Sequence, residues 1–323
     1  MTRFLYVMDP IATINPVSDT TLAFLVESQA RGVDNLVCEL KDLSARNSRG
    51  FARATRVTVQ QPMAGDARFY TAHDVIELAF DDIDVIWMRK DPPVDDLFLY
   101  ACMILDRHDP QRTLVLNNPT SLRIAHEKLW SLFEEEISPR QVISSRPDVL
   151  RAFVEEHGAG VIKPLAFMGG LGVMAFQKGD RNLKSAIDLL TAEGRRPAVM
   201  QEYLPAIRSG GDKRLILIDG EPAGALLRVP SGDDVRANLH AGGTATKTAI
   251  DDDDRRIAAR LGPHLRELGL FFVGLDIIGG KCTEVNVTSP TGVPQINRLD
   301  GRVGGNTIEA LVMDRVQQKL DAR

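Results

Sequence analysis

The sequence has no apolar run long enough to cross a bilayer. A membrane-spanning helix needs about 20 consecutive apolar residues, and no run among the 323 residues approaches that length. The opening stretch, MTRFLYVMDP, is apolar for only a few residues before Asp9, whereas a secretory signal needs a longer apolar core and a small-residue cleavage site. We therefore expect a cytoplasmic protein without a membrane partner.

Cysteine and basic charge are also scarce. The cysteines show no C-x-x-C spacing, which disfavours a metal or redox centre and predicts buried, inert thiols. The net charge is −5 and no long basic run occurs, which argues against a nucleic-acid partner because such proteins need patches that neutralise phosphates. Neither G-x-S-x-G nor H-E-x-x-H occurs, so no common motif for an enzyme nucleophile or a zinc protease is present. The three cysteines are Cys38, Cys102 and Cys282.

The chain does have ample hydrophobic content, 44%, and a regular alternation of strand and helix patterns up to residue 118. Such alternation predicts an α/β region with a parallel sheet covered by helices on both faces. Ligands of these sheets bind beyond the carboxyl ends of strands, where MDP (8–10) and RKDPP (89–93) lie. The expected strands are 3–9, 35–40, 83–89 and 113–118, and the expected helices are 20–32 and 94–108.

After residue 118 the pattern changes to an α+β region with antiparallel pairs. Residues 119–135, PTSLRIAHEKLWSLFEE, have the periodicity of a capped helix. Asp219-Gly220 joins two apolar runs, which predicts a hairpin over 213–229. The remaining expected elements are strands 140–144, 160–164, 172–177 and 198–204, a helix over 182–194, a helix over 251–269 that begins with four aspartates, and a second hairpin over 271–287.

Three glycines in VIKPLAFMGGLGV (161–173) raise the question of a phosphate-binding loop. The stretch matches neither the Walker pattern nor the dinucleotide-binding pattern, and a strand rather than a helix follows it. A phosphate here would be held by backbone N–H groups of a hairpin loop, with added charge from Lys163. The alternative is a plain glycine-rich hairpin with an incidental lysine.

The hairpin LDIIGGKCTEVNV (275–287) carries three oxygen-bearing side chains. Glu284 and Asn286 are two residues apart and share a face. Asp276 joins that face only if the turn has three residues, since a two-residue turn directs it away from Glu284. Acidic groups in an apolar hairpin are costly unless they are paired or bound to a cation. The sequence therefore indicates either a Mg²⁺ site or a salt bridge to a core arginine such as Arg214.

Two shorter stretches each allow two interpretations. MQEYLP (200–205) fits either an ordinary strand end or the edge of an adenine site. GDKR (211–214) fits either a solvated charged turn or a functional pair, Asp212 and Arg214, at the start of a strand.

Together these motifs resemble those of the prokaryotic glutathione synthetases, which belong to the ATP-grasp superfamily. The resemblance covers nearly the whole chain, and RKDPP and NVTSPTG are its most specific marks. It implies a pre-ATP-grasp domain (1–122), a small lid subdomain (123–204) and a C-terminal catalytic subdomain (205–323) with a mobile lid loop (228–246). The motifs are VMDPIATIN (7–15), MRKDPP (88–93), HEKL (126–129), VIKPL with MGG, YLPAI (203–207), GDKR, FVGLDIIG (272–279) and EVNVTSPTG (284–292).

The resemblance also implies roles for single residues. ATP would contact Lys128, Lys163, Met168, Gly169, Gly170, Gln201, Glu202, Tyr203, Leu204 and Asp212. The catalytic cations would be Arg214, Arg228 and Arg236, and the substrates would contact Arg89, Asn286, Ser289, Pro290 and Thr291. Asp276, Glu284 and Asn286 would hold Mg²⁺, with Mn²⁺ as the alternative metal. For Lys128 a second interpretation stays open, a lysine that extends to solvent beside the apolar stripe of its helix.

The activity implied is an ADP-forming C–N ligation. γ-Glutamylcysteine, glycine and ATP would give glutathione through an acyl phosphate, and the family suggests a homo-oligomer, a dimer or tetramer. Two features depart from the family: Ala166-Phe167 replaces the usual Asp-Gly before MGG, and GGTAT replaces GGRGE near the end of the lid. Two alternatives are another ATP-grasp ligase with different substrates and a nucleotide-binding regulatory protein with little turnover.

Overall fold

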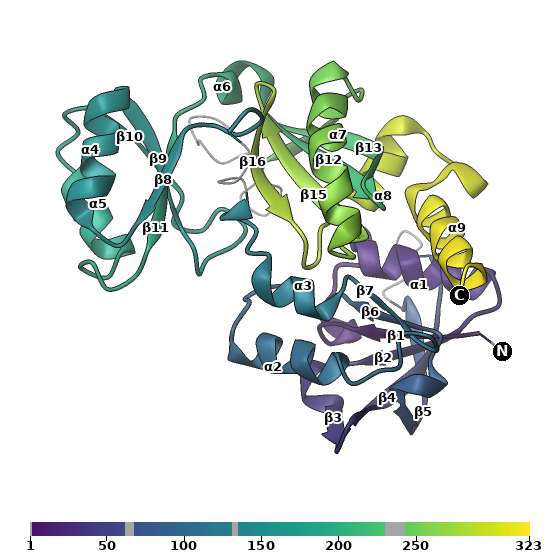
Figure 1. The fold of residues 1–323 in the computed structure, drawn as a ribbon. Helices are drawn as coiled ribbons and strands as arrows, with labels where there is room; N and C mark the ends of the chain where they lie inside the picture. The colour runs from purple at the N-terminus through teal and green to yellow at the C-terminus, as the bar shows by residue number, and fades with distance from the viewer. Residues whose placement is uncertain (1, 62–67, 131–134, 230–242) are drawn as a thin grey trace.

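The computed structural model describes residues 2–61, 68–130, 135–229 and 243–323, which fold around three β-sheets. Figure 1 shows the first sheet in the N-terminal lobe, the second at the opposite end of the molecule and the third between them. Within the described ranges, no helix combines the length and the apolar character that a bilayer-spanning segment requires. The three cysteines are free and buried, as the sequence predicts.

The N-terminal sheet has a parallel half and an antiparallel half. β1 pairs in parallel with β2 and β6, and β6 pairs in parallel with β7. β4 pairs antiparallel with β2, β3 and β5. The sequence predicted the parallel half only. The strands are β1 (Arg3–Val7), β2 (Asp34–Cys38), β3 (Leu43–Arg46), β4 (Arg49–Val59), β5 (Tyr70–Ala79), β6 (Val85–Met88) and β7 (Leu114–Leu116).

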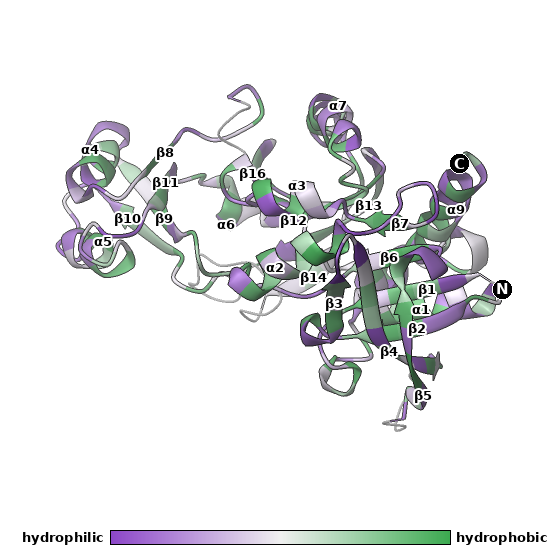
Figure 2. Cartoon of the chain, turned by 60° about the horizontal axis from the view of Figure 1, so that its bottom comes forward, coloured by the Kyte–Doolittle hydropathy of each residue, from purple (hydrophilic) through white to green (hydrophobic). Residues whose placement is uncertain are grey.

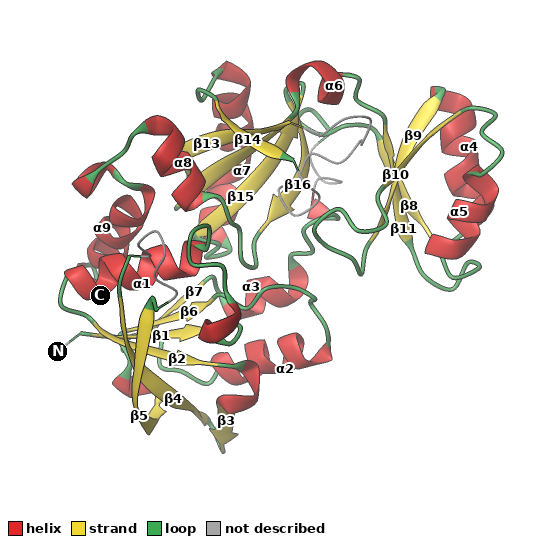
Figure 3. Ribbon diagram, turned by 180° about the vertical axis from the view of Figure 1, so that it is seen from behind, coloured by secondary structure: helices red, strands yellow, loops and turns green. Residues whose placement is uncertain are grey.

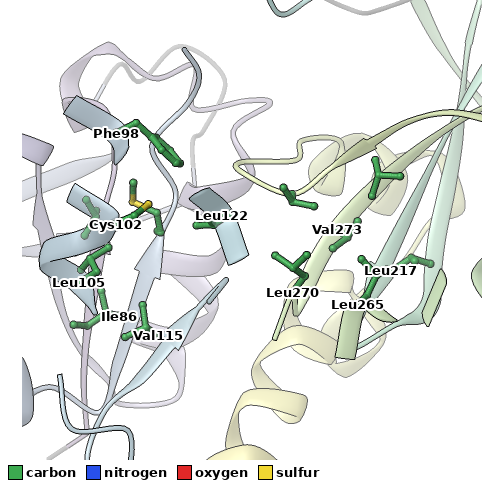
Figure 4. Close-up of a cluster of buried hydrophobic side chains, with 14 of the residues drawn as sticks. Ile86, Phe98, Cys102, Leu105, Val115, Leu122, Leu217, Leu265, Leu270 and Val273 are labelled. Carbon is green, nitrogen blue, oxygen red and sulfur yellow. The ribbon is translucent and has the colours of Figure 1, made fainter. Parts of the chain in front are cut away.

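Helices cover the parallel half on both faces, as expected for an α/β sheet. Along β1, Leu5 and Val7 belong to one hydrophobic cluster, and Phe4 and Tyr6 belong to another. Figure 4 shows part of the first cluster, with Leu122 drawn between the N-terminal side chains and Leu270. The helices are α1 (Thr20–Ala30), α2 (Asp96–Leu105) and α3 (Pro119–Ile124), with 3-10 turns at Ile11–Thr13, Leu40–Asp42 and Phe80–Asp82.

The second sheet is small and antiparallel, with the order β10-β9-β11-β8. Two helices, α4 and α5, pack on one of its faces and close a separate hydrophobic cluster (Figure 3). Figure 2 shows both hydrophobic and hydrophilic colours along α4, as expected for a helix with one buried side. The elements are β8 (Gln141–Ser144), α4 (Pro147–His157), β9 (Ala159–Pro164), β10 (Met174–Gln177), α5 (Leu183–Leu190) and β11 (Ala198–Glu202).

The third sheet is antiparallel, with the order β14-β13-β12-β15-β16. Its two predicted hairpins are confirmed. α7 begins at a capping box formed by Asp251 and Asp254 and continues through Pro263. The elements are α6 (Ala206–Gly210), β12 (Asp212–Ile218), β13 (Glu221–Val229), β14 (Thr244–Lys247), α7 (Asp252–Glu267), β15 (Phe272–Ile278), β16 (Lys281–Asn286), α8 (Val293–Asp300), a 3-10 turn (Gly304–Asn306) and α9 (Ile308–Asp321).

The helix expected over 119–135 is wrong for the residues that the structure describes up to 130, and residues 131–134 lie outside them. α3 ends at Ile124, and Ala125 leaves the helical conformation with φ −89° and ψ 84°. The residues that follow bind to the third sheet instead: the backbone carbonyl of Glu127 accepts a hydrogen bond from Val285 N at 3.1 Å. These tertiary contacts override the helical periodicity of the sequence, so Lys128 does not lie on a helix.

Asn117 connects the first and third sheets through three buried hydrogen bonds. Its Nδ2 donates to the carbonyls of Phe272 at 2.9 Å and Val287 at 2.7 Å, and Phe272 N donates to its Oδ1 at 2.8 Å. Substitution Asn117→Ala leaves these backbone groups unpaired and should lower the free energy of unfolding by about 2–3 kcal/mol. Chemical denaturation measures the change. Asn118→Ala, which removes only the cap of α3, should cost about 1 kcal/mol, and equal losses in the two variants would contradict the assignment.

Candidate functional site

A cavity of about 420 Å³ lies between the second and third sheets. Its volume is in the range of small-molecule sites. Asp91 and Pro92, from the loop that follows β6, also reach it. Asp91 N donates to Asp9 Oδ2 at 3.0 Å, so the two strand-end motifs of the first sheet are in contact. The predicted site residues that line the cavity are Lys128, Lys163, Met168, Gly169, Gly170, Gln201, Glu202, Tyr203, Leu204, Asp212, Arg214, Arg228, Asp276, Glu284, Asn286, Ser289, Pro290 and Thr291.

Two predicted site residues are not among those that line this cavity. Arg236 lies outside the described residues. Arg89 is 4% exposed, and its guanidinium packs over the rings of Phe24 and Phe272 at 5.6 and 5.5 Å. It donates to the carbonyl of Pro290 at 3.1 Å, and burial lowers its pKa to about 10. Arg89 therefore binds the 289–292 loop through a backbone carbonyl and does not line the cavity.

The glycine loop connects β9 to β10, so a strand does follow it. Gly169 has φ 63° and Gly170 has φ 77°, a conformation that side chains rarely adopt. A Cβ on Gly169 would meet nothing within 4 Å, so the backbone angle rather than crowding requires glycine there. Phe167 is 41% exposed and lines the cavity beside this loop.

The two predicted lysines converge on this cavity from different elements. Lys128 Nζ lies 2.7 Å from the carbonyl of Phe167 and 3.2 Å from Glu284 Oε1. The side chain of Lys128 is buried, so it does not extend to solvent. Lys163 Nζ donates to Gln201 Oε1 at 2.8 Å. Removal from water lowers the pKa of Lys163, and the nearby Glu284 and Asp212 partly oppose this shift.

The strand end at 201–204 contributes polar groups and one ring. Gln201 Nε2 donates to Gln141 Oε1 at 3.2 Å, and Glu202 Oε1 accepts a hydrogen bond from Arg140 N at 3.0 Å. The hydroxyl of Tyr203 is buried and has no hydrogen-bond partner in the described part of the chain. Polar atoms left unpaired at a cavity wall are suited to a polar ligand.

Two arginines and two aspartates form a buried cluster on the third sheet. Arg214 Nε binds Asp276 Oδ1 at 2.6 Å. Arg228 Nη2 binds Asp212 Oδ2 at 2.6 Å and Asp276 Oδ1 at 2.9 Å. The salt bridge between Arg214 and Asp276 is thus present, and GDKR is not a solvated turn. Asp212 Oδ1 and Arg228 Nε are buried without a partner among the described residues.

The two aspartates have opposite pKa shifts. Burial raises the pKa of Asp212 to about 6, because Arg228 offsets only part of the desolvation. Burial also acts on Asp276, but Arg214 and Arg228 outweigh it and lower the pKa of Asp276 to about 2. Near neutral pH both carboxyl groups are therefore ionised, and Asp212 takes up a proton first as the pH falls.

This difference predicts a pH-dependent effect of Asp212→Asn on stability. A raised folded-state pKa means that Asp212 favours the folded state below pH 4 and loses this contribution as the pH rises to about 6. Relative to the wild type, the variant should gain roughly 3 kcal/mol between pH 4 and pH 7. Urea unfolding of both proteins at the two pH values measures it. A difference that does not change with pH would contradict the burial of this charge.

The hairpin that carries Asp276 and Glu284 combines a two-residue turn with a bulge. Gly279-Gly280 is the turn, so of the two alternatives left open by the sequence the two-residue turn is present and the three-residue loop is not. The register then shifts between Asp276 and Ile277, and Asp276 comes to lie opposite Glu284. The irregularity restores the alignment that the two-residue turn alone would prevent.

The hard oxygen donors on this hairpin fit a divalent cation. Asn286 Nδ2 donates to the carbonyl of Gly274 at 3.1 Å, so its Oδ1 is the atom left for a metal. The set contains two carboxylates and one amide. Among the described residues, no group of three or more His, Cys, Asp or Glu side chains could hold a metal ion. Ligands of this type suit Mg²⁺, which keeps several bonds for water and phosphate oxygens.

Several residues of the site were not singled out from the sequence. Glu127 lines the cavity and accepts three hydrogen bonds from residues 287 and 288. Its place in the HEKL motif was the only available signal. Apolar positions at the cavity look like core residues in a sequence, so the apolar lining gave no signal. The apolar lining includes Val161, Val173, Ile207, Leu226 and Ile278.

Comparison with known proteins identifies the family. The model of the prokaryotic glutathione synthetase N-terminal domain matches residues 2–123, and that of the ATP-grasp domain of the same family matches residues 127–301. The chain belongs to the prokaryotic glutathione synthetases. It is 42% identical to the glutathione synthetase of Thermosynechococcus vestitus over 311 residues, which are 94% of this chain and 98% of the relative. The resemblance inferred from the motifs is confirmed.

A further relative agrees with this assignment, and solved structures show the same fold. Identity to the glutathione synthetase of Pseudomonas syringae is 42% over 319 residues, 98% of this chain and 97% of the relative. The D-cycloserine synthetase DcsG matches with a TM-score of 0.65 at 17% identity, over 97% of this chain and 99% of its own. The ATP-grasp ligase PsnB matches with a TM-score of 0.60 at 18% identity, over 98% of this chain and 99% of its own. These structures confirm the ATP-grasp fold. As a member of the glutathione synthetase family, the protein is an ATP-dependent ligase that requires a divalent metal.

Proposed function

We propose that the cavity joins γ-glutamylcysteine to glycine at the expense of ATP, giving glutathione, ADP and phosphate. The observation that carries this proposal is the convergence of Lys128, Lys163, Arg214 and Arg228 with the oxygen donors of β15 and β16 on one cavity. Phosphoryl transfer depends on positioning and on neutralising phosphate oxygens, and such a set of cations is suited to both tasks.

For ATP, we propose that the strand end at 201–204 binds the adenine and that Asp212 binds the ribose. The unpaired Tyr203 hydroxyl and Asp212 Oδ1 support this placement, since each lacks a partner among the described residues. The backbone N–H groups of Met168, Gly169 and Gly170, together with Lys128 and Lys163, would bind the phosphates. Positive φ angles at the two glycines support close approach of the backbone.

For the metal, we propose Mg²⁺ held by Asp276, Glu284 and Asn286, with Mn²⁺ as the alternative. The donor set supports this choice, because the three side chains offer only carboxylate and amide oxygens. When bound, the cation would neutralise phosphate charge during transfer. Asp276 also binds both arginines, so it would connect the metal to the catalytic cations.

In the proposed reaction, the cysteinyl carboxylate of γ-glutamylcysteine attacks the γ-phosphorus of ATP. The bond from that phosphorus to the β–γ bridging oxygen breaks, and ADP leaves. The glycine amine then attacks the carbonyl carbon of the acyl phosphate and a C–N bond forms. The C–O bond to phosphate breaks, the nitrogen loses a proton and phosphate departs. Arg214 would stabilise the phosphoryl group, and Arg228 would bind a substrate carboxylate. Ser289, Pro290 and Thr291 would lie beside the acceptor.

An acyl phosphate reacts with water, so a covering segment has a chemical purpose. We propose that residues 228–246 act as this lid, with Arg236 binding substrate. Residues 230–242 lie outside the described part of the chain. The segment begins at the end of β13 and ends in the edge strand β14, where Thr246 pairs with Leu227 of β13. Both ends of the proposed lid are therefore attached to the third sheet.

ADP release with defined acid and amine pairs tests the proposed function. Purified protein should release ADP with γ-glutamylcysteine and glycine, and it should form glutathione in equal amount. D-Alanine or glutamate in place of glycine should give little turnover. Turnover with other pairs only would favour a different ATP-grasp ligase, and ATP binding without phosphate release would favour a regulatory protein.

We also propose a homo-oligomer, a dimer or tetramer, working in the cytoplasm. Three large apolar side chains of α2, Leu97, Tyr100 and Met103, are 48–65% exposed in the single chain, which supports association because such patches commonly mark protein interfaces. The free, buried thiols are consistent with a reducing compartment. Analytical ultracentrifugation tests the oligomeric state.

A further inference from the structure

Glu127 is a buried carboxylate that takes no part in the mechanism above. It is 4% exposed. One of its oxygens, Oε1, accepts three hydrogen bonds: from Val287 N at 3.0 Å, from Thr288 N at 3.1 Å and from the Thr288 hydroxyl at 2.8 Å. A buried carboxylate is costly unless it is hydrogen-bonded, and here the donors all come from the segment that directly follows β16.

The backbone of the same residue is also bound to this strand. The carbonyl of Glu127 accepts a hydrogen bond from Val285 N at 3.1 Å. β16 is the last strand of its sheet, so its outer edge offers unpaired N–H groups. Cys282 N donates to the carbonyl of Ile137 at 2.7 Å on the same strand. The segment around Glu127 is therefore attached along the edge of β16 by side chain and backbone together.

This attachment determines where the next residue lies. Lys128 follows Glu127 directly, and its Nζ is 3.2 Å from Glu284 Oε1 on β16. α3 has already ended at Ile124, so no helix fixes the backbone of Lys128. The contacts of Glu127 with residues 285, 287 and 288 instead hold the lysine beside Glu284 and Asn286.

We propose that Glu127 is a positioning residue. It holds Lys128, the proposed phosphate ligand, beside Glu284 and Asn286, the proposed metal ligands. The inference rests on the proposed function, in which Lys128 binds a phosphate of ATP. Glu127 acts through the lysine that follows it and through Thr288, to which its Oε1 is bound. Its loss should therefore impair ATP use more than it impairs binding of γ-glutamylcysteine.

Steady-state kinetics with each substrate varied in turn tests the proposal. Glu127→Ala should raise KM for ATP about tenfold or more and lower kcat, because small displacements of a binding group have large kinetic effects. KM for γ-glutamylcysteine should stay within about twofold, a split that general damage to the fold does not produce. Glu127→Gln keeps an oxygen acceptor for the same donors and should restore KM for ATP to within about threefold of the wild-type value.

Two further variants make the test decisive. Thr288→Val removes one donor to Glu127 and should shift KM for ATP in the same direction by a smaller factor, which keeps the proposal testable if Glu127→Ala fails to fold. Glu309→Ala removes another buried carboxylate, which binds Asn297 on α8. It should lower stability and leave KM for ATP unchanged.

Lys128→Met, measured in the same assay, separates failure of the inference from failure of the proposed function. If Lys128→Met raises KM for ATP and the Glu127 and Thr288 variants do not, the positioning role is wrong. If Lys128→Met has no effect on KM for ATP, the phosphate-binding role of the lysine is wrong, and the role of Glu127 falls with it. Equal increases of KM for ATP and γ-glutamylcysteine in Glu127→Ala would also overturn the proposal.

Discussion

Replacing Glu284 with glutamine is expected to lower kcat by about a hundredfold or more. Glu284 lies opposite Asp276, on the same strand as Asn286, and these three residues are the proposed metal ligands. Glutamine is nearly the same size but has no charge to attract a divalent cation, and it also weakens the contact with Lys128 Nζ. Losses of this order are typical when a metal site or an electrostatic group of a transition state is removed.

ADP release at saturating substrates and at several Mg²⁺ concentrations measures the effect. High Mg²⁺ should recover part of the activity of Glu284→Gln, because the remaining ligands still bind the ion weakly. The matched control is Glu221→Gln, at an exposed carboxylate that binds Arg266, which should behave like the wild type. Wild-type turnover in Glu284→Gln would show that the metal lies elsewhere.

Lys163→Met should raise KM for ATP by one to two orders of magnitude. The ammonium group of Lys163 donates to Gln201 Oε1 and lies at the end of β9, directly before the glycine loop. A charge held in a cavity away from water interacts strongly with phosphate, and methionine fills a similar volume without that charge. The lowered pKa of the lysine indicates that burial is already unfavourable for the free ammonium, and a bound phosphate would relieve this cost.

The measurement is KM for ATP together with the dissociation constant of ADP. Lys163→Arg retains the charge but changes its shape, so it should recover binding only in part. Lys178→Met removes an exposed lysine whose side chain contacts Glu155, and it should leave both constants unchanged. An unchanged ADP affinity in Lys163→Met would remove this lysine from the phosphate site.

On the hairpin that carries Asp276 and Glu284, one of the two alternatives drawn from the sequence is confirmed, the salt bridge to Arg214, but the local geometry was not predicted. Residue types alone indicated either a hard metal site or a salt bridge to Arg214, and the structure shows that the salt bridge is made by the same Asp276 that faces Glu284. The bulge between Asp276 and Ile277 could not be predicted, because it depends on pairing between strands and leaves no pattern of its own in the letters.

At Lys128 the sequence pattern predicted the wrong local structure. The residues around it repeat with helical spacing, and the sequence therefore predicted a helix over 119–135. In the structure, Glu127 binds residues 285, 287 and 288, more than 150 positions away along the chain. No local pattern reports such a contact, so both the end of α3 and the role proposed for Glu127 needed the folded chain.

The sequence pattern of β5 (Tyr70–Ala79) also gave no strand signal. β5 is exposed at most of its positions, so its side chains do not show the apolar alternation that marks a half-buried strand. The parallel strands β1 and β6 are almost fully buried, and their continuous apolar runs made them recognisable. The predicted α/β region was therefore correct in its parallel half and incomplete at its edge.

Transfer of oxygen from substrate to phosphate tests the central claim most directly. γ-Glutamylcysteine labelled with ¹⁸O in its cysteinyl carboxylate is incubated with the protein, ATP, Mg²⁺ and glycine, and the released phosphate is analysed by mass spectrometry. An acyl phosphate intermediate predicts one labelled oxygen in phosphate for each ADP and each glutathione formed. Phosphate without label, or AMP in place of ADP, would contradict the proposed ligation.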